Sequence, residues 1–477
     1  MQDEPAPPTP FGQALFPVAF LLALVIYGLI IRPLGFGQAP IPLEVIFLMA
    51  ASVTIISLVM RGHSWLAVQA TIVNKIAAAL PAFFILFSIG IVISSWIICG
   101  TIPMLVYYGI KLVNPDYLYL LAFLVPAVFS TMTGTSYGSA GTIGVVLIGV
   151  AQAVGADLGI TAGAVIGGAY FGDKLSPLSD TTNLAALAAD VDLFDHIRSM
   201  LYTTIPSALI ACSVYLTVGL VSSVDFATAD IADVDLLLDG LSSMFKFSVV
   251  LLLPPIVVLA GSIKRMPTVP TLLGSAAIAS ILAVLFQPFS PADLFQSLNK
   301  GFDASMAGWA GEVSNEVMVL VNRGGLYALI DAIVVAFAVF IYIGALDHIR
   351  AMPTVVDRVF RFAQTKTSTI LASLVSSAFV NALTSNQYAT SFIVGDAFKV
   401  KYDQKGVSRR VLSRSIEDYG TMIESIVPWT VTAVFMVATL GVPFADYWNW
   451  QILSLANIVV APTIAILGIG CFYEKET

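Results

Sequence analysis

The residues of this chain that are best suited to chemistry form a run of oxygen donors at position 180. Asp180 is followed directly by Thr181, Thr182 and Asn183. Carboxylate, hydroxyl and amide oxygens are the ligands that hard cations prefer over sulfur or imidazole. The run therefore predicts a site for a small cation. The alternative is that Asp180 only caps the helix that follows it.

Two further carboxyl groups are candidates for function. Asp173 stands next to Lys174, so a local ion pair competes with a functional role. Glu424 lies in an apolar stretch with Ile423 and Val427. An ionised acid at the centre of a bilayer costs roughly 2.5 to 3.5 kcal/mol on insertion scales, which makes acids inside a membrane functional candidates by default. We therefore consider Glu424 as a proton carrier or as the partner of a substrate's ammonium group.

The polar breaks that contain these acids occur twice in the chain. Residues 135–140 read TSYGSA, and residues 384–389 read TSNQYA. Each is followed by a second break, at 172–183 and at 420–430. Non-helical backbone at membrane depth survives only where it is buried in protein or lines a wet cavity, and paired breaks in two halves indicate a transporter's binding site. The hydroxyl and amide candidates in these breaks are Thr135, Ser136, Ser139, Ser176, Ser179, Thr384, Ser385, Asn386 and Thr430.

The composition requires a membrane around the chain. Of its 477 residues, 58% are hydrophobic and 11% are charged, with a mean hydropathy of +0.91. An average soluble domain has roughly 25% charged residues. Apolar runs near the bilayer-spanning length of about 20 residues occur at 14–35, 42–60, 77–99, 117–132, 199–222, 243–262, 268–287, 326–346, 368–383 and 449–471. With interrupted runs at 141–171 and 388–446, the chain is expected to form an all-α polytopic membrane bundle.

Charged loops predict the orientation and the division of the chain. Lys and Arg cluster at 264–265, 348–366 and 399–414, whereas 222–240 is acidic. By the positive-inside rule the basic clusters are cytoplasmic and the acidic stretch is exterior. We expect a first transmembrane half at 1–224, a connecting acidic exterior loop and linking helix at 225–270, and a second half at 271–477. The net charge of −8 argues against nucleic acid or anionic lipid as a partner, although membrane lipid surrounds the bundle.

The sequence lacks the motifs of the common catalytic classes. It contains no P-loop, no Cys/His metal-ligand cluster and no nucleophile elbow. We therefore expect neither an enzyme nor a cofactor.

Several motifs follow one another between about residues 80 and 460. They are GTIPMLVYYGIK at 100–111, GTS at 134–136, GDKLSPLSDTTNL at 172–184, DLFDHIR at 192–198, RGG at 323–325, and the segment from 413 to 429 with Glu417, Asp418 and Pro428-Trp429. This series resembles the NhaC group of sodium/proton antiporters in the ion transporter superfamily. The resemblance implies a secondary transporter of the plasma (inner) membrane with two inverted repeats, re-entrant hairpins and sodium sites around the hairpin tips. We assign Asp180, Asn183 and Thr135 as the expected sodium ligands.

The second-half motif departs from the pattern of that group. Glu424 stands where the group usually has a serine, Ser425 stands where it has a proline, and Thr430 replaces an asparagine. Two functions therefore stay open. One is exchange of Na+ for H+ by alternating access, and the other is Na+-coupled symport or exchange of a small amino acid or organic acid. Na+ and H+ are the expected coupling ions, and the sequence leaves a homodimer open.

Overall fold

The computed structural model is a helical bundle in which short helices meet end to end inside the molecule. It describes residues 9–112, 114–221, 231–264, 266–307, 315–359 and 363–473. Within these residues, eight helices are long and apolar enough to cross a membrane, and up to ten if each of two bent pairs counts as one span. The expectation of an all-α, multi-pass membrane protein is thereby confirmed.

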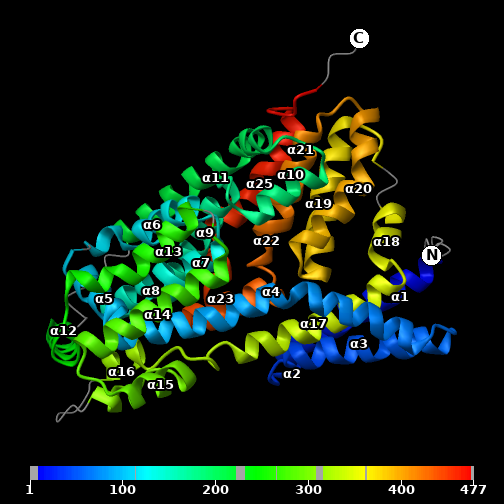
Figure 1. Ribbon diagram of the computed structural model, residues 1–477. Helices are drawn as coiled ribbons and strands as arrows, with labels where there is room; N and C mark the ends of the chain where they lie inside the picture. The colour runs from blue at the N-terminus through cyan, green and yellow to red at the C-terminus, as the bar shows by residue number, and fades with distance from the viewer. Residues whose placement is uncertain are drawn as a thin grey trace.

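Long helices form the lower layer in Figure 1. Helix α17 packs against both α4 and α3, and α14 and α15 pack against α4. The elements of this layer and of the end that closes it are α1 (Phe11–Val25), η1 (Ile26–Ile31), α2 (Arg32–Phe36), α3 (Leu43–Met60), α4 (Trp65–Ile98), α5 (Thr101–Leu112), α12 (Ile231–Met244), α13 (Leu253–Ile263), α14 (Thr268–Phe286), α15 (Pro291–Lys300), α16 (Asn315–Val321), α17 (Ile330–His348) and α18 (Ala351–Val359).

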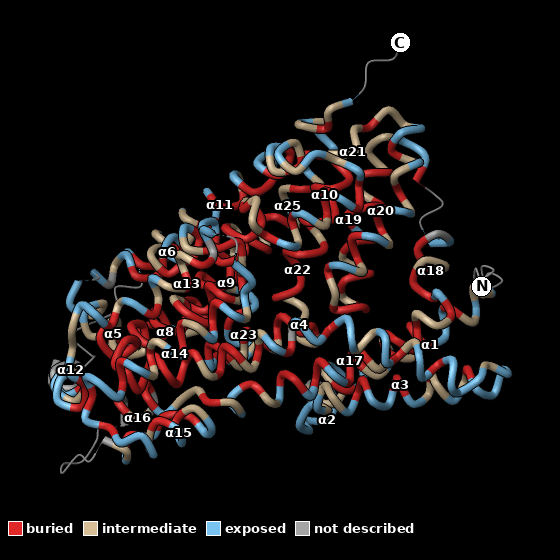
Figure 2. Tube along the Cα trace, in the orientation of Figure 1, coloured by how far each residue is buried: buried red, intermediate tan, exposed pale blue. Residues whose placement is uncertain are grey.

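The upper layer holds the polar breaks, and its broken helices are packed against α11 and α25. The first-half elements of this layer are α6 (Leu118–Thr133), α7 (Ser136–Ser139), η3 (Ala140–Gly144), α8 (Val145–Ala153), α9 (Leu158–Leu175), α10 (Asp180–Ala188) and α11 (Leu193–Val221). Those of the second half are α19 (Lys366–Thr384), α20 (Gln387–Gln404), α21 (Arg409–Ile416), η7 (Glu417–Thr421), α22 (Met422–Glu424), α23 (Val431–Leu440), α24 (Phe444–Tyr447) and α25 (Ile452–Leu467). Buried residues concentrate in this layer, whereas the outer faces of α1 and α3 are exposed (Figure 2).

Two expected spans differ from the structure. The run at 243–262 is no straight helix, because Leu236–Met244 and Val249–Gly261 meet at 94°. The side chain of Gln287 satisfies the backbone at this bend: Lys246 N–H donates to its Oε1 at 2.9 Å, and its Nε2 donates to the Lys246 carbonyl at 2.9 Å. The span expected at 77–99 begins earlier, at Trp65, since Lys75 stays helical and pairs with Asp347 at 2.6 Å.

The structure covers only part of the acidic stretch at 222–240. Residues 222–230 lie outside the described residues, and from Ile231 the chain is helix α12, within the range 225–270 for which an exterior loop and a linking helix are expected. The division into two halves and their inverted relation stay predictions.

A buried ion pair joins the two halves of the chain. Lys174 of α9 contacts Asp418 of η7, and the two side chains are 0% and 1% exposed. Thr203 donates to the same carboxylate at 2.9 Å, and the Asn457 amide donates to the Asp418 carbonyl at 3.0 Å. The partner of Lys174 is therefore Asp418, and not the neighbouring Asp173 that the sequence suggested.

We expect Asp418→Asn to lower the free energy of unfolding by about 3 to 5 kcal/mol, because it leaves the Lys174 ammonium buried without its counter-charge. The melting temperature of the purified protein in detergent measures this. The control is Asp195→Asn, because Asp195 is itself 37% exposed and pairs with the solvent-accessible side chains of Arg198 and Arg410, and pairs that water reaches contribute only about 0 to 1 kcal/mol. Equal shifts in melting temperature for both variants would show that the buried pair contributes no more to stability than the exposed one.

Candidate functional site

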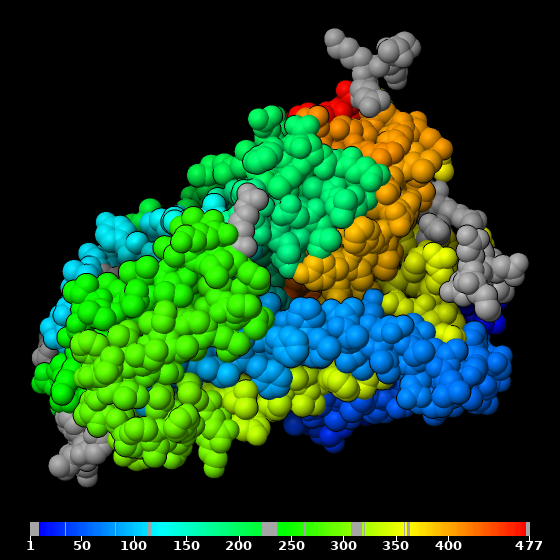
Figure 3. Space-filling model, viewed as in Figure 1, coloured from blue at the N-terminus to red at the C-terminus, as the bar shows by residue number. Residues whose placement is uncertain are grey.

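The polar breaks surround one cavity of about 1020 Å³. Its walls come from α4, from both breaks of the first half and from both breaks of the second half. Figure 3 shows the molecule hollowed above α4, between the first-half and second-half parts of the upper layer. Met266 to Pro270, just after the basic pair at 264–265, also belong to the wall.

The two breaks of the first half touch each other. Helix α6 ends at Gly134, whose φ of 67° is in the left-handed region that favours glycine. A methyl group at this position would lie 2.7 Å from the Leu178 carbonyl carbon, so the turn packs directly on the second break. Thr135 then caps α7 by accepting the Gly138 N–H, and Ser179 caps α10 by accepting the Thr182 N–H.

The second half repeats this arrangement. Helix α19 ends at Thr384, followed by Ser385 with a left-handed φ of 48°. Ser385 Oγ accepts the Val431 N–H at 2.6 Å, which joins the two breaks of this half. Asn386 caps α20, and Thr430 caps α23. The helix N-termini at both pairs of breaks border the cavity, and such ends attract negative charge.

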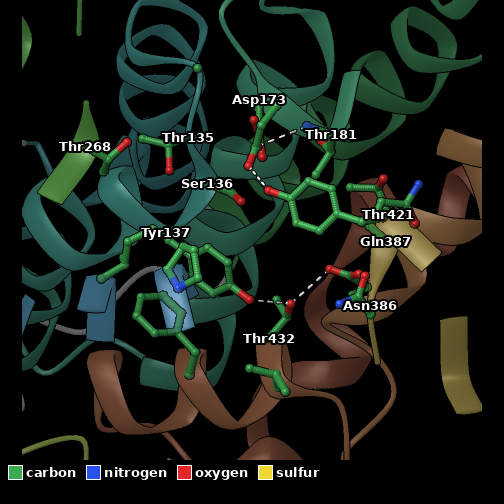
Figure 4. Close-up of a pocket in the computed structure, with 18 of the residues that line it drawn as sticks. Thr135, Ser136, Tyr137, Asp173, Thr181, Thr268, Asn386, Gln387, Thr421 and Thr432 are labelled. Carbon is green, nitrogen blue, oxygen red and sulfur yellow. Dashed lines mark hydrogen bonds between the residues drawn. The ribbon is translucent and has the colours of Figure 1, made fainter. Parts of the chain in front are cut away.

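Glu424 lies in the cavity wall with a hydrogen-bond donor on each of its carboxylate oxygens. Its Oε1 accepts a hydrogen bond from Asn381 Nδ2 at 2.8 Å, and its Oε2 accepts one from Thr432 Oγ1 at 2.9 Å. Tyr137 of the first half donates to Thr432 at 2.7 Å (Figure 4). Both of these donors come from the half that contains Glu424, and Thr432 also connects Glu424 with Tyr137 in the break at 135–140.

The first-half acids have different surroundings. Asp180 accepts a hydrogen bond from Tyr388 of the second half and another from its own Thr181 N–H at 3.0 Å. Asp173 is 4% exposed and lines the cavity beside Ser136 (Figure 4). It also faces Ser179, which lies behind the wall. In the part of the chain that the structure describes, the Oδ1 atom of Asp173 has no hydrogen-bond partner. Tyr388 thus contacts an acid of the other half directly, whereas Tyr137 contacts Thr432, the donor to Glu424.

The structure separates the predicted site residues into two groups. One group lines the cavity: Thr135, Ser136, Asp173, Asp180, Thr181, Asn183, Ser385, Asn386 and Glu424. The other group bonds mainly to nearby backbone in the breaks and is not part of the wall: Ser139, Ser176, Ser179, Thr182, Thr384 and Thr430.

The expected sodium ligands all lie at the cavity but already have protein partners. Asn183 donates its amide to the carbonyls of Pro177 and Ser179, at 3.0 and 2.6 Å. Thr135 and Asp180 accept backbone N–H groups at the starts of α7 and α10. Throughout the described ranges, no group of three His, Cys, Asp or Glu residues is placed to hold a metal ion. The ligand assignment stays a prediction.

Sequence reasoning missed several wall residues. Tyr137 and Tyr388 lie within the doubled segments, so their position in the repeats could have identified them. Thr432, also in the wall, follows the last break by two residues. Asn381 is not part of the wall but donates to Glu424, and it precedes the break at 384–389 by about one helical turn. Lys75 lies on α4, and no signal in the sequence relates it to the breaks.

The chain matches the model of the Na+/H+ antiporter family over residues 168–469. It is 39% identical to an uncharacterised Na+/H+ antiporter of Haemophilus influenzae, over 95% of this chain and 96% of that protein. The chain belongs to the Na+/H+ antiporter family. It is also 33% identical to the Na+/H+ antiporter NhaC of Alkalihalophilus pseudofirmus over 98% of the chain and 97% of the relative. A malate-2H+/Na+-lactate antiporter of Bacillus subtilis is 30% identical over 87% of both chains.

Family membership confirms the resemblance to NhaC that the motifs carried. Together with the apolar helices, it places the chain in the plasma membrane as a multi-pass protein. The relatives are antiporters by name, and one of them exchanges organic acids.

We expect Gly134→Ala to destabilise the protein, because a left-handed φ costs a non-glycine residue roughly 1 to 2 kcal/mol and the new methyl group would press on Leu178. Gly274→Ala in α14 is the control. A methyl group there meets nothing within 4 Å, and alanine is favoured over glycine in a helix by about 1 kcal/mol. Melting temperatures in detergent should move in opposite directions. If Gly134→Ala were as stable as Gly274→Ala, the close packing of the turn at Gly134 on the break at 172–183 would be contradicted.

Proposed function

We propose that the protein is a secondary transporter that exchanges Na+ for H+ by alternating access at this cavity. The observation that carries the proposal is the cavity itself, where an acid of each half is connected to a tyrosine of the other half. The membership in the Na+/H+ antiporter family supports the same conclusion.

The wall offers oxygen atoms suited to Na+. Asp180, Asn183 and Thr135 are the proposed ligands in the first half, and a hard cation of this kind prefers such carboxylate, amide and hydroxyl oxygens. Na+ would displace the contact between Tyr388 and Asp180, because both use the same carboxylate. Binding of the ion therefore acts directly on a contact between the two halves.

Glu424 is the proposed proton site. Its hydrogen bonds from Asn381 and Thr432 suit the ionised carboxylate, since both partners donate. Adding a proton removes the charge and one acceptor position, which weakens the connection through Thr432 to Tyr137. Proton binding in the second half and sodium binding in the first half would thus loosen matching cross-contacts.

Alternating access then follows from these two contacts. The proposal includes the division into halves at 1–224 and 271–477 and their inverted relation, which would let equivalent movements open opposite faces. The wall residues 266–270 adjoin the basic pair at 264–265, which the positive-inside rule places in the cytoplasm. The cavity of this structure is accordingly proposed to face the cytoplasm.

A second candidate function is Na+-coupled transport of a small amino acid or organic acid. The cavity of about 1020 Å³ is far larger than two ions require and is comparable to sites for small molecules, which measure roughly 300 to 1,000 Å³. Helix N-termini around it suit a carboxylate. The named substrates of the Bacillus subtilis relative, malate and lactate, belong to this class.

Asp180→Asn should raise the sodium concentration for half-maximal transport by about tenfold or more, which is about 1.4 kcal/mol of lost binding, because a neutral amide replaces the anionic ligand. Sodium uptake into proteoliposomes measures this. Asp190→Asn is the control at the other end of α10, where Asp190 is 56% exposed and pairs with Lys399 and Arg409. Unchanged sodium affinity in Asp180→Asn would make Asp180 a structural residue.

Glu424→Gln separates the two candidate functions. If Glu424 carries the proton, the variant loses the pH dependence of transport and still binds sodium. If Glu424 holds a substrate's ammonium group, the variant loses binding of that solute at every pH, by roughly 2 to 5 kcal/mol when the charge stays buried and unpaired. Parallel assays with sodium, pH and labelled-solute gradients decide between them, with Glu44→Gln at the start of α3 as the control. Wild-type behaviour of Glu424→Gln in all of these assays would show that Glu424 is not part of the transport site.

A further inference from the structure

Glu417 is a carboxyl group that the proposed exchange does not yet use. It is 0% exposed and lies in η7, at the start of the stretch that leads to Glu424. Among the described residues, neither of its carboxylate oxygens has a hydrogen-bond partner. An ionised carboxylate in such a place would lose its hydration, and no hydrogen bond formed in this structure would replace it. Glu417 is therefore suited to the neutral, protonated form, in contrast with Glu424 and its donors.

Thr421 lies between the two acids. Glu417, Thr421 and Glu424 follow one another at intervals of four and three residues, which brings them to the same side of a helix. The side chain of Thr421 faces Glu417, and Thr421 is also part of the cavity wall (Figure 4). Over the described ranges its hydroxyl has no hydrogen-bond partner. One unpaired hydroxyl thus separates a buried acid from the cavity.

The backbone at this place is also unusual. Residues Glu417–Thr421 form a π-helical turn between α21 and α22. Such turns are rare and occur frequently at functional sites. The π-helical turn therefore coincides with the segment that carries the unpaired side chains of Glu417 and Thr421.

Lys174 supplies a positive charge near Glu417. Lys174 of α9 is bound to Asp418 and acts electrostatically on Glu417 as well. A lysine ammonium has three N–H donors, so it can bond a second carboxylate without leaving the first. Loss of a proton from Glu417 would consequently create a charge that Lys174 can share.

The other groups around Glu417 do not supply a second cation at close range. Asp173 of α9 and Glu424 of α22 are acids that act on it electrostatically. Arg414 of α21 is directed to the carbonyls of Ser199 and Gly470. The side chains of the packed helices α19, α20 and α25 that reach this stretch are the uncharged amides of Asn381, Gln387 and Asn457, and α10 contributes the acid Asp180 at the cavity.

We propose that Glu417 is a second proton-binding carboxyl group behind the cavity wall, connected with Glu424 through the hydroxyl of Thr421. In the transfer, the O–H bond of Glu417 breaks and its proton passes to the Thr421 oxygen, while the Thr421 proton passes to the Glu424 carboxylate. The negative charge moves from Glu424 to Glu417, next to Lys174. The proposal rests on the proposed function, because it adds one proton to an exchanger of Na+ for H+.

The test is the sodium gradient that just balances a fixed pH gradient in proteoliposomes held at zero membrane potential. For a cycle that carries one sodium ion, each transported proton changes this balancing sodium gradient by about tenfold per pH unit, because one pH unit corresponds to 2.303RT of proton free energy. Glu417→Gln keeps the shape of the neutral acid and cannot release a proton. We expect the balancing gradient for each pH unit to fall about tenfold relative to the wild type, while a pH dependence due to Glu424 remains.

Thr421→Val serves where Glu417→Gln fails to fold, since it removes the connecting hydroxyl and should lower the balancing gradient in the same way. Thr439→Val is the matched control, because Thr439 is also buried with a hydroxyl that lacks a partner among the described residues, but it is not part of the cavity wall. A wild-type balancing gradient in Glu417→Gln or in Thr421→Val would overturn the inference and leave the exchanger intact. Absence of sodium/proton exchange in the wild type would instead overturn the proposed function.

Discussion

Helices that begin and end inside a membrane protein must satisfy their terminal backbone groups without water. In this protein, side chains within the breaks of each half supply these hydrogen-bond partners. Thr135, Ser179, Asn386 and Thr430 cap the helices that start there, and Ser385 accepts a backbone N–H from the neighbouring break. Of these side chains, Thr135, Ser385 and Asn386 also line the cavity, whereas Ser179 and Thr430 are not part of its wall.

This constraint explains why the breaks contain more hydroxyl groups than the cavity uses. Thr182 donates to the carbonyls of Asp173 and Lys174 near the end of α9, and Thr430 donates to the carbonyl of Glu424 at the end of α22 and to that of Val427 beyond it. These residues hold the chain in its broken form. They thereby also fix the backbone next to the wall residues Asp180 and Glu424.

The ion pair of Lys174 and Asp418 lies behind this arrangement and joins α9 to η7. A buried pair is retained only with good geometry and further hydrogen bonds, which Thr203 supplies here. Because α9 leads into the break at 172–183 and η7 leads into the break at 420–430, the pair ties these two breaks together. The three acids near it, Asp173, Glu417 and Glu424, differ mainly in the number of donors around them.

The sequence by itself determined the membrane class, the places of most spans and the doubled breaks, because hydrophobic length and local helix-breaking residues are properties of neighbouring positions. It also indicated the family, through motifs of the same local kind. Tertiary structure alone decided the partner of Lys174, which is 244 residues away, and the bend at 245–248, where Gln287 replaces missing backbone partners. It likewise decided which hydroxyls face the cavity. Contacts between distant segments depend on how helices pack, and neither hydropathy nor spacing along the chain contains that information.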